Sequence, residues 1–349
     1  MSLDELVGRA RQLVDEGVTP ACQLAVARDG HVLAFETFGA ATNENRFCAF
    51  SATKPIVASV MWMLMDQGLL APDQLVVDHI PEFGSHGKHR ITIEEVMLHT
   101  AGFPSALLRP VDGADAERRR TAFSAWPLEW EPGSRFEYHP ESAHWVLVDL
   151  IERVTGLDFR DAIEAQLCVP LGLPRLLGIP VDEQRDIVGG VRVGPPRDHP
   201  DPLMTVANDP DARAAGVPGG GGIMTAETMV HFYQAVLNNP GGLWKPETLH
   251  DATTRVRCTF DDPMLGAPVN RSLGLVLAGD DGMHQLRYAM FGKECSPGSF
   301  GHAGAYLQVA WADPATGTSF AFLKNGYCVD MLADAGNVLP LCDLAAALP

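Results

Sequence analysis

Basic residues are scarce in this 349-residue sequence, and their scarcity excludes several classes of partner. The chain has 26 lysines and arginines against 44 aspartates and glutamates, which gives a formal net charge of −18. Nucleic-acid binding needs a positive surface that displaces counterions from phosphates. An acidic surface also disfavours anionic membranes and mainly promotes solubility. We therefore expect neither a nucleic-acid partner nor a membrane partner.

Long apolar runs are missing as well. The longest extends from Ile56 to Met65, whereas a helix that spans a bilayer needs about 20 apolar residues. The first 17 residues predict an amphipathic helix with charges throughout, and they lack the apolar core and cleavage site of a signal peptide. These absences predict a cytoplasmic protein.

Cysteine and histidine patterns typical of metal sites are also absent. The seven cysteines are scattered, odd in number and never spaced Cys-x-x-Cys. This predicts reduced, mostly buried thiols rather than a disulfide framework or a zinc site. His79, His86, His89 and His99 are close in sequence but do not form a ligand-spaced set. We expect no metal and no organic cofactor.

Strand patterns lie at the two ends of the chain, and helical patterns lie between them. Asp29-Gly30 is a strong hairpin signal between two of the strands. The expected strands are 23–28, 31–36, 305–311 and 318–323, and the expected helices are 52–68, 92–99, 141–155, 158–167, 226–238 and 331–348. The segment 194–222 contains six prolines and six glycines, which predicts a long irregular segment; segments of this kind are functional borders or lids, or else merely disordered.

The simplest architecture is α/β plus all-α. The two ends join into an antiparallel sheet covered by terminal helices, and the helical middle is an inserted subdomain. The expected sheet subdomain comprises residues 1–55 and 255–349, and the helical subdomain comprises residues 56–254. Because clefts between subdomains are common places for active sites, we expect the site at their junction.

The first candidate for chemistry is Ser51-Ala-Thr-Lys54, at the start of the most hydrophobic helix of the chain. A spacing of three residues puts the hydroxyl and the amine on one helical face. A serine hydroxyl is a poor nucleophile until a neighbouring group takes its proton. A lysine can do so only if burial or a neighbouring cation lowers its pKa. Alone, the pattern is more typical of a serine N-cap followed by a solvated lysine, and only its context favours catalysis.

Two further segments add to this pattern. Tyr138 follows a Pro132-Gly133 turn and precedes a helix, so its phenol could project into a cleft and relay protons. It could also simply cap the core. Gly301-His302-Ala303-Gly304-Ala305 leads into a late strand, where a free N–H could complete an oxyanion hole with that of Ser51. The alternative is a glycine-bounded strand start with a surface histidine.

In chain order, SxxK, the tyrosine and His-Ala-Gly together resemble the motifs of the serine β-lactamase and penicillin-binding-protein superfamily. The resemblance is closest to the class C β-lactamase branch, which includes family VIII carboxylesterases and D-aminopeptidases. It covers about residues 5–325. Further segments that resemble the family are Leu98-His-Thr-Ala-Gly-Phe-Pro, Glu131-Pro-Gly-Ser-Arg-Phe-Glu-Tyr, Ile151-Glu-Arg-Val-Thr-Gly, Pro218-Gly-Gly-Gly-Gly-Ile-Met and Leu273-Gly-Leu.

The resemblance implies roles for individual residues. Ser51 would be the acylated nucleophile and Lys54 its base partner, and Tyr138 matches the tyrosine of the family's Tyr-x-Asn motif. The segment from His302 to Gly304 matches the substrate-binding Lys-Thr-Gly motif, which is often His-x-Gly in esterase members. Ala305 matches the residue whose backbone N–H joins that of Ser51 in the oxyanion hole.

Two departures from the family pattern shift the prediction toward esters. The asparagine of Tyr-x-Asn, which in lactamases contacts the substrate amide, is Pro140 here. The lysine of Lys-Thr-Gly, which helps to hold the β-lactam carboxylate, is His302, which is neutral over much of the physiological pH range. Both changes weaken recognition of a carboxylated amide and leave the acylation machinery in place.

We therefore predict a serine hydrolase that cleaves small carboxylic esters through an acyl-enzyme on Ser51. A β-lactamase, a D-amino-acid amidase or peptidase, and an acyltransferase are the alternatives, and a non-catalytic binding protein of the same fold is a remote one. The expected partner is a small ester or amide, and the sequence specifies no oligomeric state. The glycine run from Gly219 to Gly222 lacks the Gly-Lys-Ser/Thr ending of a phosphate-binding loop.

Overall fold

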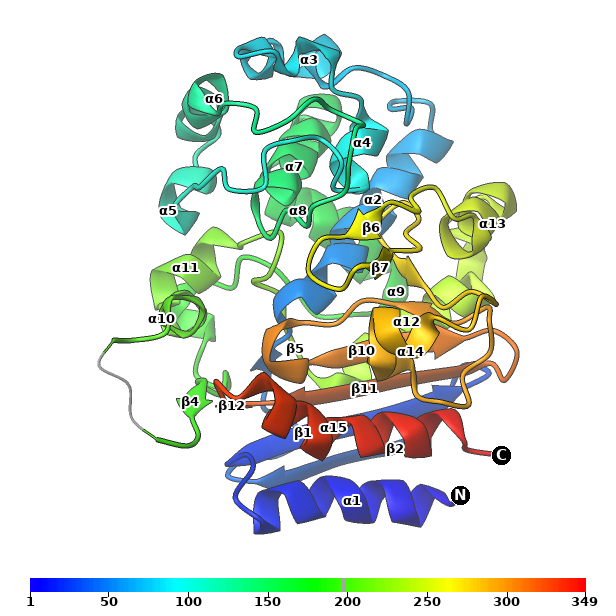
Figure 1. The fold of residues 1–349 in the computed structure, drawn as a ribbon. Coiled ribbons are helices and arrows are strands. Elements are labelled where there is room, and N and C mark those ends of the chain that lie inside the picture. Colours follow the sequence, from blue (N-terminus) through cyan, green and yellow to red (C-terminus); the bar gives the residue numbers. More distant parts are fainter. Residues whose placement is uncertain (196–198) are drawn as a thin grey trace.

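The computed structural model describes residues 1–195 and 199–349. Six strands form one antiparallel sheet in the order β2-β1-β11-β10-β9-β8 (Figure 1). These strands are β1 Ala21–Arg28, β2 His31–Gly39, β8 Val276–Leu277, β9 Phe300–Gly301, β10 Val309–Asp313 and β11 Thr318–Lys324. The expected sheet built from both ends of the chain is confirmed.

Helices cover both faces of this sheet, which explains why every residue of β1 except the last is buried. Helices α1 (Leu3–Asp15) and α15 (Met331–Ala346) lie side by side on one face (Figure 1), where Leu6 and Leu341 share a core with Leu24. On the other face α12 (Ala226–Asn238) packs against the sheet. The expectation of terminal helices over an antiparallel sheet is therefore confirmed.

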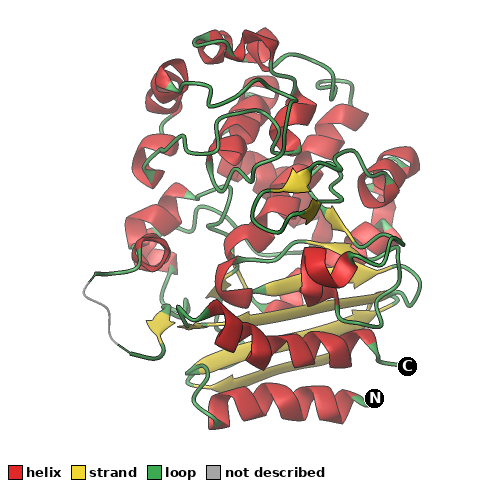
Figure 2. Cartoon of the chain, viewed as in Figure 1, coloured by secondary structure: helices red, strands yellow, loops and turns green. Residues whose placement is uncertain are grey.

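A mainly helical region lies beside the sheet (Figure 2). Its elements are α2 Lys54–Asp66, α3 Val76–His79, α4 Ile93–Met97, α5 Pro110–Gly113, α6 Ala116–Ala125, α7 Ser142–Thr155, α8 Phe159–Ile163, α9 Val169–Leu171, α10 Pro202–Asn208, α11 Pro210–Ala215 and α13 Pro246–Thr254. Helix α14 (His284–Tyr288) lies near the sheet instead. The described residues also form three short strand pairs: β3 Phe47–Cys48 with β5 Ile223–Met224, β4 Val191–Arg192 with β12 Gly326–Tyr327, and β6 Asp261–Asp262 with β7 Ala267–Pro268.

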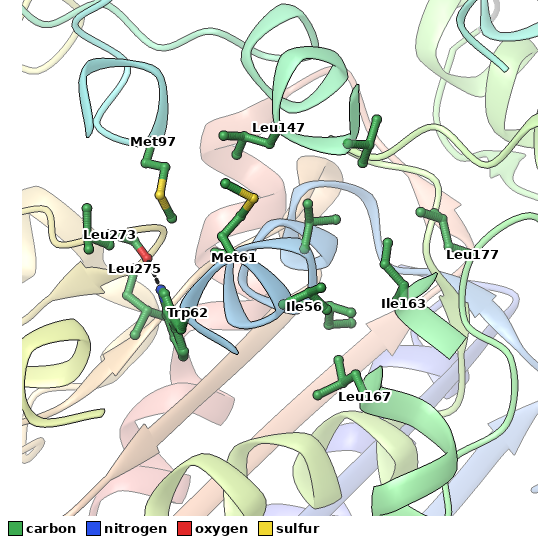
Figure 3. Close-up of a cluster of buried hydrophobic side chains, with 14 of the residues drawn as sticks. Ile56, Met61, Trp62, Met97, Leu147, Ile163, Leu167, Leu177, Leu273 and Leu275 are labelled. Atoms are coloured by element: carbon green, nitrogen blue, oxygen red, sulfur yellow. Dashed lines mark hydrogen bonds between the residues drawn. The ribbon is translucent and has the colours of Figure 1, made fainter. Parts of the chain in front are cut away.

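Helix α2 is the centre of the core and joins the two regions. All of its residues from Lys54 to Leu64 are buried. Figure 3 shows Met61 and Trp62 of α2 among side chains from several elements, and the Trp62 indole N–H donates to the carbonyl of Leu273 at 2.9 Å. Because α2 is fixed on all sides, the residues at its N-terminus are held rigidly.

Two expectations about local structure are wrong. The segment 194–222 is not irregular throughout, since it contains α10 and α11; residues 196–198 lie outside the described residues. Each of these helices begins with an aspartate N-cap followed by proline, Asp201-Pro202 and Asp209-Pro210, and proline fits the first turn of a helix because its missing N–H has no partner there anyway.

The second error concerns the expected strand at 305–311. Strand β10 begins only at Val309, and Ala305–Leu307 form a 3₁₀ turn in which Tyr306 and Leu307 have positive φ. Such φ values interrupt an extended strand. The expected helix at 226–238 is confirmed at both ends, with Thr225 as its N-cap.

All seven cysteines are free, and four of them are buried, as expected. None of the described helices is both long enough and apolar enough to cross a membrane. Within residues 1–195 and 199–349, no group of three or more histidine, cysteine, aspartate or glutamate side chains has an arrangement that could hold a metal ion.

Candidate active site

Ser51 and Lys54 lie together where the chain enters α2. Ser51 is in the 3₁₀ turn Phe50–Thr53, and Lys54 is the first residue of the helix, with Pro55 in its first turn. The Lys54 Nζ donates to Ser51 Oγ at 3.1 Å, and the lysine side chain is buried. The structure therefore brings the predicted nucleophile and its predicted base partner into hydrogen-bond contact.

The other contacts of Lys54 constrain how it can act. Its Nζ also donates to the backbone carbonyls of Pro140 and Gly219, both at 2.6 Å. Carbonyl oxygens only accept hydrogen bonds. A neutral amine that gives its two hydrogens to these carbonyls keeps its lone pair for the third direction, which is that of Ser51. This geometry suits a lysine that takes the proton of the serine.

The glycine run contributes to this site through its backbone rather than through phosphate binding. The carbonyl of Gly219 accepts from Lys54, and the N–H of Gly222 donates to Thr53 Oγ1 at 2.9 Å. A Cβ at Gly222 would lie 2.5 Å from that oxygen, and one at Gly219 would lie 2.7 Å from the carbonyl oxygen of Pro140. Side chains here would push the run away from the start of α2. No side chain marks this role in the sequence, because the contacts are made by the glycine backbone.

Tyr138 approaches Lys54 through its ring. The Nζ lies 5.0 Å from the ring centroid, within the range of a cation–π contact. The phenol oxygen is buried and has no hydrogen-bond partner in the described part of the chain. Tyr138 is thus brought to the predicted site, while its expected part in proton relay stays a prediction.

The segment from His302 to Ala305 lies directly against the chain that carries Ser51. A Cβ at Gly304 would lie 2.1 Å from the carbonyl oxygen of Ala49. The absence of a side chain at Gly304 therefore lets the backbone next to the nucleophile approach closely. Ser51, His302, Gly304 and Ala305 all line one cavity of about 390 Å³. The structure thus brings the predicted oxyanion and substrate-binding residues together with Ser51.

The backbone is strained where these two segments meet. Phe50, the residue before Ser51, has φ of 46°, and Tyr306 has φ of 56°. Non-glycine residues rarely adopt positive φ, and such strain is common at functional sites. The two rings stack edge to face, with centroids 5.4 Å apart. This contact helps to hold both strained residues in place.

His302 is neutral in this environment. Burial, and after it the positive charges of Arg271 and Lys54, lower its pKa well below the usual value. Its Nδ1 lies 2.8 Å from the carbonyl oxygen of Ala303 and must therefore carry the hydrogen, so Nε2 is an acceptor. The Arg271 guanidinium donates to that Nε2 at 3.4 Å.

Arg271 and Glu141 are site residues that the sequence analysis missed. Both line the cavity beside Ser51. Burial raises the pKa of the Glu141 carboxyl, and the nearby charge of Lys54 opposes this shift. Neither residue belongs to a motif, and no local pattern marks them. Arg271 stands two residues before the Leu273-Gly-Leu segment, which is the one sequence feature that points to its neighbourhood.

Three further histidines gather behind the site. The ring centroid of His99 lies 5.9 Å from that of His139 and 6.1 Å from that of His144. The N–H of His139 donates to His99 Nδ1 at 3.2 Å, and the N–H of Phe103 donates to His139 Nε2 at 3.0 Å. Burial lowers the pKa of all three. His99 and His139 therefore act as neutral packing and hydrogen-bonding groups, and His144 acts as a neutral packing group whose ring nitrogens have no hydrogen-bond partner among the described residues.

The walls of the cavity are mostly apolar. Leu203 from α10 lies on one side, and Leu265 and Met264 from the β6–β7 hairpin lie on another. A smaller pocket of about 120 Å³ shares Phe50 and Leu203 with the cavity. An apolar cavity with a few convergent polar groups is typical of small-molecule sites.

Comparisons with known proteins agree with this geometry. Residues 7–339 match the sequence model of the family described as Beta-lactamase. The chain is 27% identical over 316 residues to the esterase/beta-lactamase LipL of Mycobacterium tuberculosis, covering 79% of this chain and 68% of that protein. It is 31% identical over 274 residues to the esterase EstB of Burkholderia gladioli, covering 66% and 68%. The fold matches a solved family VIII carboxylesterase with a TM-score of 0.81 at 21% identity, covering 98% of this chain and 97% of that one.

Proposed function

Because the chain belongs to the beta-lactamase family, we propose that it is a serine hydrolase that cleaves small carboxylic esters through an acyl-enzyme on Ser51. Two of the relatives, LipL and EstB, are named esterases. The observation that carries the proposal is the 3.1 Å contact between Lys54 Nζ and Ser51 Oγ at the wall of an apolar cavity.

In the acylation step, Ser51 Oγ attacks the ester carbonyl carbon and its proton passes to the lone pair of Lys54. The carbonyl oxygen becomes an oxyanion, and we propose that the backbone N–H groups of Ser51 and Ala305 hold it. When the carbonyl re-forms, the bond to the alkoxide breaks, and the leaving alcohol takes the proton that Lys54 received. The product is an ester of the acyl group with Ser51.

Deacylation repeats these events with water as the nucleophile. Lys54 takes a proton from the water, the new oxygen–carbon bond forms, and the bond to Ser51 Oγ breaks as the serine regains a proton. A carboxylic acid leaves the cavity. Tyr138, whose ring already contacts Lys54, is proposed to relay protons between the lysine and the leaving group.

The proposed site draws on both parts of the chain. Ser51 and Ala305 come from the proposed sheet subdomain, residues 1–55 and 255–349. Tyr138 and Gly219 come from the proposed helical subdomain, residues 56–254. We propose that catalysis takes place at the junction of the two.

Intact-mass measurement after mixing with p-nitrophenyl acetate and p-nitrophenyl butyrate tests the proposal. The expected result is a transient mass increase of one acyl group, located on Ser51 by peptide mapping. Ser51→Ala should remove both the adduct and the turnover while leaving the thermal midpoint nearly unchanged, because it deletes one oxygen at the edge of a cavity. Turnover above about a tenth of wild type in Ser51→Ala, or an adduct on another residue, would rule out the assignment.

A further inference from the structure

Arg271 places a fixed positive charge in the wall of the cavity that contains Ser51. Within residues 1–195 and 199–349 no carboxylate forms an ion pair with its guanidinium, and its one side-chain hydrogen bond goes to His302 Nε2 at 3.4 Å. A guanidinium has five N–H donors. Most of its hydrogen-bonding capacity is therefore unused, although it is only partly exposed.

Acidic groups compensate some of the other arginines that lose much of their exposure. Arg119 pairs with Asp149 and Glu152, and Arg257 pairs with Asp251 and Glu94. Burial of a charge is costly unless an opposite charge or strong hydrogen bonds offset it. Arg192 and Arg213 form no ion pair with a carboxylate among the described residues either, but Arg271 differs from them because it lies in the wall of the candidate active site.

Aromatic rings hold the guanidinium of Arg271 in position. The centroids of the Phe136 and Tyr138 rings both lie 5.3 Å from its central carbon. Stacking on aromatic faces is a preferred environment for arginine and leaves the edge of the fork free to bind an acceptor. The side chain is thus fixed without using up its donors.

The other charged groups around the cavity leave this cation unneutralised. Asp262 lines the same cavity, but its Oδ1 accepts from the backbone N–H of Met264 and it forms no ion pair with Arg271. Arg287 is paired with Asp281. Burial lowers the pKa of Arg271, and Tyr138 and Asp262 oppose this shift; an arginine nevertheless remains protonated at physiological pH.

We propose that Arg271 is the receptor for an anionic group on the substrate, so that the preferred esters carry a carboxylate at the far end of an apolar chain. This assignment rests on the proposed ester hydrolysis at Ser51. The apolar walls formed by residues such as Leu203 and Val269 surround the chain, and the guanidinium fork donates hydrogen bonds to both oxygens of the carboxylate. Half-esters of dicarboxylic acids have this chemistry. Arg271 thereby supplies the permanent cation that His302 does not.

The test compares two esters of equal chain length, p-nitrophenyl hexanoate and the mono-p-nitrophenyl ester of adipic acid. Wild type is expected to have a kcat/KM at least about tenfold higher for the anionic ester. Arg271→Gln is expected to lower kcat/KM for the anionic ester by about 30-fold, and by at least about tenfold more than it lowers kcat/KM for the neutral ester. Arg271→Lys should retain part of the preference because it keeps the charge but not the fork.

Arg135→Gln is the matched control. Arg135 also stacks on an aromatic ring, that of Trp130, but it does not line the cavity, so this substitution removes the same charge outside the site. Arg135→Gln should leave the ratio of kcat/KM for the anionic ester to kcat/KM for the neutral ester unchanged. Equal losses for both esters in Arg271→Gln would overturn the proposal, because they would show that Arg271 acts on the reaction through Tyr138 rather than on the substrate.

A binding measurement separates this proposal from the proposed function. Titration calorimetry of adipate with Ser51→Ala needs no turnover. The expected result is binding that weakens by about 30-fold when Arg271→Gln is added. If no ester is hydrolysed but this difference holds, the ester function fails and the anion site stands. If adipate binds both variants equally, the anion-site proposal fails, whether or not the protein hydrolyses esters. If Arg271→Gln does not fold, competition of adipate with the anionic ester in the wild-type enzyme provides the test instead.

Discussion

The side-chain nitrogen of Lys54 lies 3.1 Å from the hydroxyl oxygen of Ser51, and its two other hydrogen-bond partners are the backbone carbonyls of Pro140 and Gly219. This enclosure leaves the amine one direction in which to exchange a proton, and that direction is toward the serine. If proton transfer is its task, charge alone at this position is insufficient.

The first prediction follows for Lys54→Arg. A guanidinium stays protonated at any workable pH, so kcat/KM for p-nitrophenyl butyrate should fall by at least about a hundredfold, nearly as far as in Lys54→Ala. Lys88→Arg is the matched control, because Lys88 is also buried and also donates to backbone carbonyls, but away from the cavity. An active Lys54→Arg enzyme would show that this position supplies charge rather than a base.

The second prediction concerns the choice between esters and lactams. Pro140 has no side-chain amide to pair with a substrate amide, and an unpaired polar group costs about 1–3 kcal/mol. Amides are also harder to cleave than activated esters. We expect kcat/KM for p-nitrophenyl butyrate to exceed that for a penicillin by at least about a hundredfold, which needs about 2.7 kcal/mol of differential stabilisation.

The comparison with penicillin includes a chromogenic cephalosporin and correction for spontaneous hydrolysis. Arg271 is available to a lactam carboxylate, so the expected preference depends on the missing amide partner and not on missing charge. Lactam turnover as fast as ester turnover would contradict the prediction. His139 and Ser142 would then be the first residues to test as replacements for the asparagine.

The third prediction concerns the close approach at Gly304. Its Cβ position lies 2.1 Å from the Ala49 carbonyl oxygen, so Gly304→Ala must displace one of the two segments that form the site. We expect a loss of about 2 kcal/mol of unfolding free energy together with a fall in kcat. The control is Gly336→Ala in α15, where nothing lies within 4 Å of the added methyl; it should be neutral or slightly stabilising. Full activity in Gly304→Ala would show that the contact is not needed.

The fourth prediction concerns stability in acid. Burial lowers the pKa of His139 from 6.5 to about 4. Between these pH values His139 binds a proton in the unfolded chain but not in the folded chain. Its full contribution to the free energy of unfolding is therefore present above pH 6.5, and it is lost as the pH falls toward 4. The shift corresponds to a loss of roughly 3 kcal/mol. Chemical denaturation at a series of pH values should show this decline.

His139→Gln should make the fall of unfolding free energy with decreasing pH less steep, by the slope that the uptake of about one proton produces, because glutamine does not titrate in this range. The same change at His231, which is exposed, should leave the profile as it is in wild type. The remaining slope is assigned to His99, His144 and His302, whose pKa values are also lowered by burial. Identical pH profiles for wild type and His139→Gln would contradict the prediction.

Elements with local signals were predictable from the sequence. Helix α12 has an N-cap at Thr225 and ends at Asn239 in the left-handed conformation, so both boundaries are specified by adjacent residues. The hairpin at Asp29-Gly30 was predictable for the same reason, since both residues have the positive φ that its turn requires. The spacing of Ser51 and Lys54 likewise fixes their contact within one short segment.

Features that depend on distant segments were not predictable in this way. The turn at Ala305–Leu307 exists because Tyr306 packs on Phe50, about 250 positions earlier in the chain. The third partner of Lys54 is a glycine carbonyl, which has no side chain to mark it. Arg271 was missed because its significance lies in the absence of a carboxylate beside it, and only the fold shows which groups are its neighbours.

The pairing of β1 has a consequence for how the protein is made. One edge of β1 pairs with β2, its immediate neighbour in the chain, whereas the other pairs with β11, so that Arg28 meets Thr318. At a synthesis rate of about 5–20 residues per second, the first hairpin leaves the ribosome well before its second partner exists. During that interval the Ser51–Lys54 segment is already made, but Ala305 is not. The nascent chain therefore keeps one edge of β1 open to unwanted pairing until β11 is made and closes it, and over the same interval it lacks a residue of the proposed oxyanion hole.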